Sequence, residues 1–204
     1  MNTQESPMSL PKPYEMQGSK KTIAELFEIL EMLALVTVCV MFCFAFVARM
    51  NIVDGHSMDT TLADGQYLVV SDLFYTPKAG DIIVIHDVTA TPYDRPIVKR
   101  VIATGGQELE IDFKTWTLTV DGAVVDEPYR YLDSTKSLLT ANYNLDTDGV
   151  FRITVPEGEV FVMGDNRNGS GDSRQASLGT IDERCIIGRA YFRIFPLDQL
   201  GKLF

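Results

Sequence analysis

The order of apolar and polar residues divides the chain into three parts. Residues 1–31 are mostly polar, and the first 21 of them include three prolines and three lysines. Residues 32–48 (MLALVTVCVMFCFAFVA) form a run without charge, after which short alternating segments lie between turn-forming residues. The pattern predicts a polar tail over residues 1–28 whose first 21 residues are disordered, one apolar helix over residues 29–49, and a mostly β remainder.

The apolar run has the length of a minimal membrane-spanning helix. Its 17 residues, at about 1.5 Å each, just reach the lower limit for crossing a bilayer. A buried core helix and a cleaved signal peptide are the alternatives. No polar stripe breaks the run, and the long leader carries Glu25, Glu28 and Glu31, which is unusual for a signal peptide. We therefore expect an uncleaved anchor in membrane lipid.

Basic residues beside the run predict its orientation. Lys12, Lys20 and Lys21 precede it, whereas only Arg49 follows closely. Because basic residues tend to stay on the cytoplasmic side, we expect a single-pass protein of the cell membrane. Its N-terminus would be cytoplasmic and its β portion extracellular.

The part after the run reads as a series of short strands. Alternation or short apolar stretches bounded by turn residues predict strands within residues 66–73, 80–88, 96–104, 107–111, 115–125, 149–155, 158–165 and 186–195. Asp121-Gly122 is a tight-hairpin signal. Residues 107–154 are predicted to form a β subdomain inserted into a core made of residues 50–106 and 155–197.

Composition narrows the possible functions. A formal net charge of −10 argues against nucleic-acid binding, which needs a basic surface. Cys39 and Cys43 lie in the apolar run and Cys185 stands alone, so neither a disulfide framework nor zinc spacing is readable. His56 and His86 are the two histidines of the chain. We therefore expect no metal and no cofactor.

Ser57, in the stretch GHSMDTTL, is the first candidate for chemistry. A serine hydroxyl needs a neighbouring base before it is a good nucleophile. His56 is a poor base for it, because adjacent residues in an extended segment point to opposite faces. His86 with Asp87 leaves a Ser–His–Asp arrangement open, and a plain turn or surface hydroxyl is the alternative.

Lys99, in RPIVKRVIATGG, is the second candidate. By alternation it shares a strand face with Ile97 and Val101. An edge-strand lysine that reaches water is the ordinary interpretation. A buried lysine, by contrast, has a lowered pKa and can act as a general base. The neighbouring Arg100 cannot, because guanidinium keeps its proton.

The third candidate is the loop GDNRNGSGDSR, residues 164–174. It does not fit a calcium loop, because Arg167 stands at a ligand position and Ala176 where a bidentate glutamate belongs. It offers serine hydroxyls beside matched charges. These can orient a neighbouring amine, or they can simply fix the shape of a turn-rich loop.

Taken in order, these features resemble bacterial type I signal peptidases of the single-anchor type. An anchor, a Gly-x-Ser-Met segment, a Lys-Arg pair in a strand and the eleven-residue loop follow one another between roughly residues 53 and 196. The loop is the most specific element. DGQYLVV, GDIIV and VDGAVVDEPY are weaker matches.

The resemblance implies an activity and a set of roles. Family members are serine endopeptidases that remove signal peptides from secretory preproteins after a small-x-small motif, and the secretion machinery is a possible partner. Ser57 matches the nucleophile and Lys99 the general base, and the backbone N–H of Ser57 would donate to the oxyanion. Ser170 matches a hydroxyl that orients the lysine. Further matches are Asp172 and Arg174 as supporting residues, and Asp165 with Arg167 as a structural ion pair.

The implied fold is mostly β. It is a signal-peptidase/LexA-like β core with an inserted β subdomain, preceded by one N-terminal transmembrane helix. Such a fold would bind an extended substrate by strand addition.

The chain departs from the family pattern at three places. Thr60 replaces a proline that would pre-set the backbone after the nucleophile. Gly55 stands where some members carry a serine that donates to the oxyanion, so no side chain is available there. IATGG replaces a more usual Gly-Leu-Pro-Gly turn after the lysine.

Three other functions stay open. A self-cleaving repressor uses a related dyad, but the apolar run occupies the place of its DNA-binding module. A non-catalytic surface protein on the same fold would bind peptides. A specialised peptidase would process only pilin-like or conjugation substrates.

Overall fold

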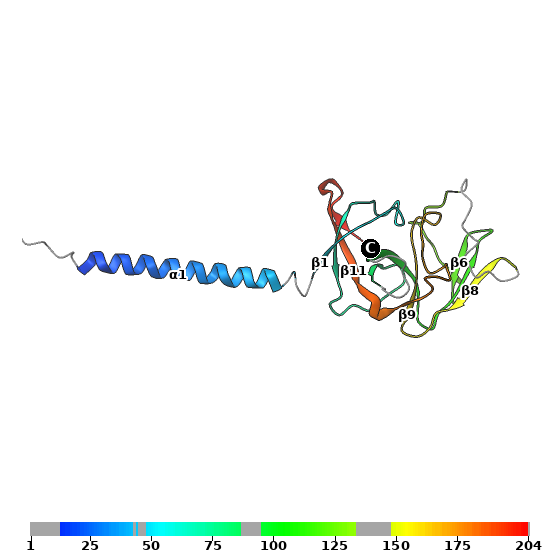
Figure 1. The fold of residues 1–204 in the computed structure, drawn as a ribbon, viewed down its shortest axis with the longest axis horizontal. Helices are drawn as coiled ribbons and strands as arrows, with labels where there is room; N and C mark the ends of the chain where they lie inside the picture. Colours follow the sequence, from blue (N-terminus) through cyan, green and yellow to red (C-terminus); the bar gives the residue numbers. More distant parts are fainter. Residues whose placement is uncertain (1–12, 43, 45–47, 87–94, 134–147, 204) are drawn as a thin grey trace, which may run out of the picture. The chain divides into compact units, whose positions relative to one another are not determined.

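A computed structural model describes residues 13–42, 44, 48–86, 95–133 and 148–203. The chain divides into two compact units, Met1–Ala45 and Phe46–Phe204. Each is described by itself (Figure 1).

The first unit contains one helix, α1 (Pro13–Phe42). A proline is accepted at the first position of a helix, where its missing N–H has no partner to lose. The prediction of disorder is wrong for residues 13–21, because the helix continues back through them; Glu, Met, Gln and Lys in that stretch favour a helix. Among the described residues, no helix combines the length and the apolar character that crossing a membrane requires. Cys43 and residues 45–47 of the apolar run lie outside them.

The second unit is built mainly on a curled antiparallel sheet. Its strand order is β1-β2-β11-β3-β4-β9-β10, and β12 pairs with β11. The strands are β1 (Arg49–Ile52), β2 (Tyr67–Ser71), β3 (Ile82–Ile85), β4 (Ile97–Thr104), β9 (Glu159–Met163), β10 (Ile181–Asp182), β11 (Ile186–Phe195) and β12 (Gly201–Lys202). Short 3-10 turns, η3 (Glu183–Cys185) and η4 (Leu197–Gln199), flank β11.

A smaller sheet lies between β4 and β9 in the chain. Its order is β7-β6-β5-β8, from β5 (Glu108–Asp112), β6 (Thr117–Val120), β7 (Ala123–Val124) and β8 (Val150–Thr154). The predicted hairpin at Asp121-Gly122 is confirmed: β6 pairs with β7, and both turn residues have positive φ, 51° and 77°. Figure 1 shows β6 and β8 at the end of this unit away from β1.

A shared core joins the two sheets. Leu109, Ile111 and Phe151 of the smaller sheet pack with Phe161 and Met163 of β9, all of them buried. This packing fixes the end of β9, from which the loop of residues 164–174 departs.

All eight predicted stretches contain a strand, so a mostly β fold is confirmed. β1, β10 and β12 were not predicted. β1 begins at Arg49, where the anchor was expected to end, and its four residues pair with β2. A strand this short leaves little periodicity to read.

Candidate active site

Ser57 lies in a turn that follows β1. Residues 57–61 are turn residues, and Leu62 N–H donates to Met58 O (2.9 Å). The extended segment expected there is therefore wrong. Gly55 has φ +89°, a conformation that favours glycine, and its N–H donates to Asp64 Oδ1 (2.7 Å). Gly55 thus shapes the bend that leads into Ser57.

Among the described residues, neither His56 nor His86 hydrogen-bonds to the Ser57 hydroxyl. His56 is exposed, with Nδ1 3.1 Å from Asp59 Oδ2. His86 lines another pocket, together with Arg49 and Cys185. Asp87, the third member of the alternative triad, lies outside the described residues.

Lys99 reaches Ser57 from β4. Its Nζ donates to Ser57 Oγ at 2.7 Å. β4 lies between β3 and β9, and Lys99 pairs with Ile83. The lysine is 4% exposed, so the interpretation as an edge-strand lysine is wrong. Arg100, next along the strand, points elsewhere and binds Asp165.

Burial lowers the pKa of Lys99 to about 8. Asp172 and Asp165 oppose the shift, whereas the Arg174 guanidinium adds to it. A large fraction of the amine is therefore neutral at pH 8, with a lone pair available for a proton. An amine in that state beside a hydroxyl can act as a general base.

The Gly164–Arg174 loop folds around a buried ion pair. Arg174 Nε and Nη2 donate to the two oxygens of Asp172 at 2.7 and 2.8 Å, and both side chains are fully buried. Gly164 N–H also donates to Asp172 (3.0 Å). Burial alone would raise the pKa of Asp172, but Arg174 and the hydrogen bonds hold it below its usual range. Asp172 therefore remains ionised in the folded protein.

Ser170 lies inside this loop and is 8% exposed. Within the described part of the chain its Oγ has no hydrogen-bond partner of ordinary geometry, although the hydroxyl helps to lower the pKa of Asp172. A Cβ added at Gly164 would overlap Ser170 Oγ and Ser57 O. Gly164 therefore allows the loop to pack directly against the Ser57 backbone.

The expected pair between Asp165 and Arg167 does not form. Asp165 accepts from Arg100 Nε and Nη2 at 2.8 and 2.7 Å and from Thr61 Oγ1 at 2.5 Å. Arg167 binds both oxygens of Glu127 instead. Neighbouring loop residues project to different sides, so each finds a partner from another segment. The order of charged residues along the chain does not by itself reveal such partners.

Ser57 and Lys99 open onto a cleft of about 200 Å³. It is lined by Asp54, Gly55, His56, Ser57, Arg95, Pro96, Ile97, Lys99, Gly169 and Gly171. Asp172 and Arg174 are fully buried and do not line it. The structure thus brings together all the site residues predicted from the sequence: Ser57 and Lys99 at the cleft, with Gly55, Ser170, Asp172 and Arg174 around them.

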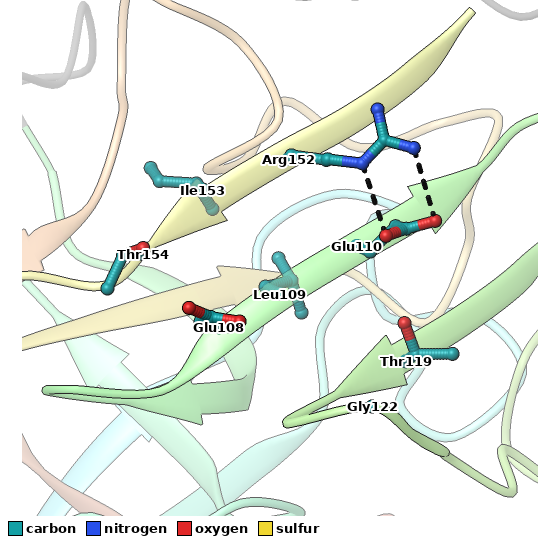
Figure 2. A pocket seen from close by; sticks show the side chains of 8 residues that line it. All are labelled: Glu108, Leu109, Glu110, Thr119, Gly122, Arg152, Ile153 and Thr154. Atoms are coloured by element: carbon teal, nitrogen blue, oxygen red, sulfur yellow. Dashed lines mark hydrogen bonds and ion pairs between the residues drawn. The ribbon is translucent and has the colours of Figure 1, made fainter. Parts of the chain in front are cut away.

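Another pocket, of about 410 Å³, lies on the smaller sheet (Figure 2). Glu110 and Arg152 project from neighbouring strands and form an ion pair across it. None of the predicted site residues lines this pocket. Among the described residues, no group of His, Cys, Asp and Glu side chains could hold a metal ion.

Asn166 and Thr61 were missed by sequence reasoning. Asn166 donates from its backbone and side chain to the Ser57 segment, and Thr61 binds Asp165. Thr61 lies in the motif GHSMDTTL and Asn166 in the motif GDNRNGSGDSR, both of which were candidates in the sequence. Their roles depend on contacts more than 100 residues apart, which no local pattern signals.

Comparison with known proteins shows which family the chain belongs to. The family model described as signal peptidase, peptidase S26, matches residues 26–195. A probable signal peptidase I-1 of Synechocystis sp. is 38% identical over 166 residues, covering 78% of this chain and 76% of that protein. Signal peptidase I of Bacillus licheniformis is 36% identical over 192 residues, covering 92% and 97%. A solved signal peptidase I of Enterococcus faecalis aligns with 56% of this chain and 97% of its own, at 27% identity and a TM-score of 0.41. On the family model and the two sequence relatives, the chain belongs to the signal peptidase family of peptidases, S26.

Proposed function

We propose that this chain is a membrane-anchored serine endopeptidase that removes N-terminal signal peptides from secretory preproteins. It cuts after a small-x-small motif and uses Ser57 as nucleophile and Lys99 as general base. The observation that carries the proposal is the 2.7 Å contact between a buried amine of lowered pKa and the Ser57 hydroxyl.

The chemistry follows from the protonation state of Lys99. The neutral amine accepts the Ser57 proton as Oγ attacks the scissile carbonyl, and the Ser57 N–H donates to the oxyanion that forms. The resulting ammonium gives its proton to the leaving amine, which becomes the N-terminus of the mature protein. Lys99 then takes a proton from the water that attacks the acyl carbon, and it returns a proton to Ser57 Oγ as the ester bond breaks, which restores the neutral amine and the hydroxyl.

The supporting residues hold this pair in place. Asp172 and Arg174 form the buried ion pair of the loop, Ser170 packs against Gly164 of the same loop, and Gly55 shapes the turn before the nucleophile. The Asp172 charge raises the pKa of Lys99 against the larger effect of burial, and Arg174 partly cancels it.

The substrate would enter the cleft as an extended peptide. Backbone hydrogen bonds to an exposed strand position it, and alternate small side chains enter pockets too narrow for larger ones. The partners are therefore secretory preproteins, with the secretion machinery delivering them.

The proposed topology follows the sequence pattern. Residues 1–28 are cytoplasmic and residues 29–49 contain the anchor. Residues 50–106 and 155–197 form the extracellular catalytic core, and residues 107–154 the inserted subdomain. The anchor would tether the catalytic core to the membrane from which preproteins emerge.

Cleavage of a preprotein with an Ala-x-Ala site, in detergent, tests the function. Mass spectrometry should find one cut, after the second alanine, and none in a preprotein with leucine at either alanine. Binding of both preproteins without any cut would favour the non-catalytic peptide-binding protein. Cleavage confined to pilin-like or conjugation preproteins would favour the specialised peptidase.

The pH dependence of kcat/KM should follow Lys99. The base works when deprotonated, so the rate should rise about tenfold per pH unit below pH 8 and level off above, where the amine is neutral. Initial rates on a signal-peptide substrate from pH 5.5 to 10 give the profile. A break near pH 6.5, the ordinary pKa of histidine, would refute Lys99 as the base.

A further inference from the structure

Asn166 ties the Ser57 turn to the Gly164–Arg174 loop by two hydrogen bonds. Its backbone N–H donates to Ser57 O (3.0 Å), and its side-chain Nδ2 donates to His56 O (2.9 Å). The same side chain accepts from Gly169 N–H through Oδ1 (3.1 Å), which fixes the orientation of the amide. One residue therefore holds both peptide groups that flank Ser57.

The geometry of a peptide group gives this contact a consequence. The bond between His56 and Ser57 is trans, so His56 C=O and Ser57 N–H lie in one plane and point in opposite directions. A donor that fixes the carbonyl therefore also fixes the direction of the N–H. Among the residues that the structure describes, none accepts a hydrogen bond from Ser57 N–H. That donor remains available at the cleft.

A second bond to the same carbonyl does not replace Asn166. Asp59 N–H also donates to His56 O, at a longer 3.3 Å. Asp59 belongs to the same turn and moves with it. Asn166 belongs to the loop that follows β9, the neighbour of the strand that carries Lys99. The contact from Asn166 therefore fixes the Ser57 turn relative to the strands that carry Lys99 and the loop.

We propose that Asn166 is a positioning residue that aims the Ser57 N–H at the oxyanion of the transition state. This rests on the proposed function, in which Ser57 attacks a peptide carbonyl. The hydrogen bond from Asn166 Nδ2 stabilises mainly the transition state, because the substrate carbonyl in the ground state carries less charge for the Ser57 N–H to stabilise.

Two substitutions isolate the Nδ2 donor. In Asn166→Asp an oxygen remains that can accept from Gly169 N–H, and no donor remains for His56 O. In Asn166→Ser the hydroxyl can also accept from Gly169 N–H, but it stands one bond short of the Nδ2 position, so its O–H does not reach His56 O. Asn168 offers matched controls in the same loop, since its Oδ1 accepts from Asp133 N–H (2.8 Å). Asn168→Asp and Asn168→Ser make the same chemical changes at a side chain whose described contact is to Asp133.

Cleavage of a signal-peptide substrate at pH 9.5 keeps Lys99 neutral in every variant. We expect both Asn166 variants to lose about 10- to 100-fold in kcat, less than the 10²–10³ for deleting an oxyanion donor, with KM within about twofold. The affinity of a peptide aldehyde, whose adduct carries an oxyanion, should fall by the same factor as kcat/KM. The affinity of the cleaved signal peptide, used with an amidated C-terminus so that no carboxylate lies beside the Ser57 N–H, should stay unchanged, as should all parameters of the Asn168 variants.

Active sites are counted by binding of the cleaved signal peptide, so partial unfolding cannot imitate a loss in kcat. Asn166 variants that match the Asn168 variants would overturn the proposal. So would a loss in KM alone, or equal losses for the aldehyde and the cleaved peptide, which would indicate a structural role. If Asn166→Asp does not fold, the uncharged Asn166→Ser decides by the same criteria. An inactive wild-type protein would refute the proposed function. If the wild type and the Asn166 variants are both fully active, only this inference is refuted.

Discussion

Lys99→Ala is expected to lower kcat by several orders of magnitude while the protein stays folded. Without the amine 2.7 Å from Ser57 Oγ, the described geometry leaves no base for the hydroxyl proton. Ser57→Ala should lose as much, because members of such a unit act together and their losses do not add. Lys99→Arg should fail equally, since guanidinium keeps its proton at any useful pH. Cleavage of the Ala-x-Ala preprotein measures all three.

Lys114→Ala is the matched control. Lys114 follows β5 and binds Asp148 O, away from the cleft, so its loss should leave cleavage unchanged. Retained activity in Lys99→Arg would refute the lysine as base. If Ser57→Ala still cleaves the preprotein, a contaminating protease can be the cause, and a serine-directed inhibitor added to the same preparation tests for one. Cleavage that is traced to a contaminant would support the peptide-binding alternative.

Lys99→Met separates the chemistry from the fold. The folded-state pKa, about 8, lies below the ordinary value of 10.5, so folding releases protons between these pH values and stability rises with pH there. Below pH 8 the folded protein bears the full cost of burying the charge, roughly 3 kcal/mol at the usual conversion. Methionine removes that cost. The variant should therefore be inactive yet unfold at a higher temperature at pH 6.5, with the gain shrinking as pH rises toward 10.5.

The strand positions and the proposed catalytic pair could be predicted because both leave local patterns in the sequence. Alternation and turn residues located β4, and the pattern IVKRV put Lys99 on one face and Arg100 on the other, as the structure has them. The order of motifs supplied Ser57 as the partner, since an isolated serine carries little information.

The rest depends on contacts that the sequence order hides. Asp165 and Arg167 lie two residues apart, but burial sends them to Arg100 and Glu127 on other segments. The turn at residues 57–61 also escaped prediction. Part of its hydrogen bonding comes from Asn166, more than 100 residues later. Long-range packing of this kind overrides local preference.

Gly164→Ala should lower kcat at least about 100-fold, because a methyl group there displaces the nucleophile. The added Cβ would overlap Ser57 O and Ser170 Oγ, and would lie 2.6 Å from Ser170 Cβ. Neither neighbour can move freely. Ser57 O accepts from Asn166 N–H, and Ser170 lies two residues before the fully buried Asp172. The overlap must therefore spread into the Ser57–Lys99 contact, where about 1 Å of misplacement is enough for such a loss.

Gly201→Ala is the control for this substitution. A Cβ there meets its nearest neighbour, Gln199 O, at 3.9 Å, an ordinary contact, so activity and stability should not change. Gly164→Ala should destabilise the fold by about 1–3 kcal/mol, as overpacking does elsewhere. Its kcat, counted per site that binds the cleaved signal peptide, should still show the full loss. Normal kcat in that variant would mean that the loop yields without moving Ser57, and the tight packing at Gly164 would then have no part in holding the dyad.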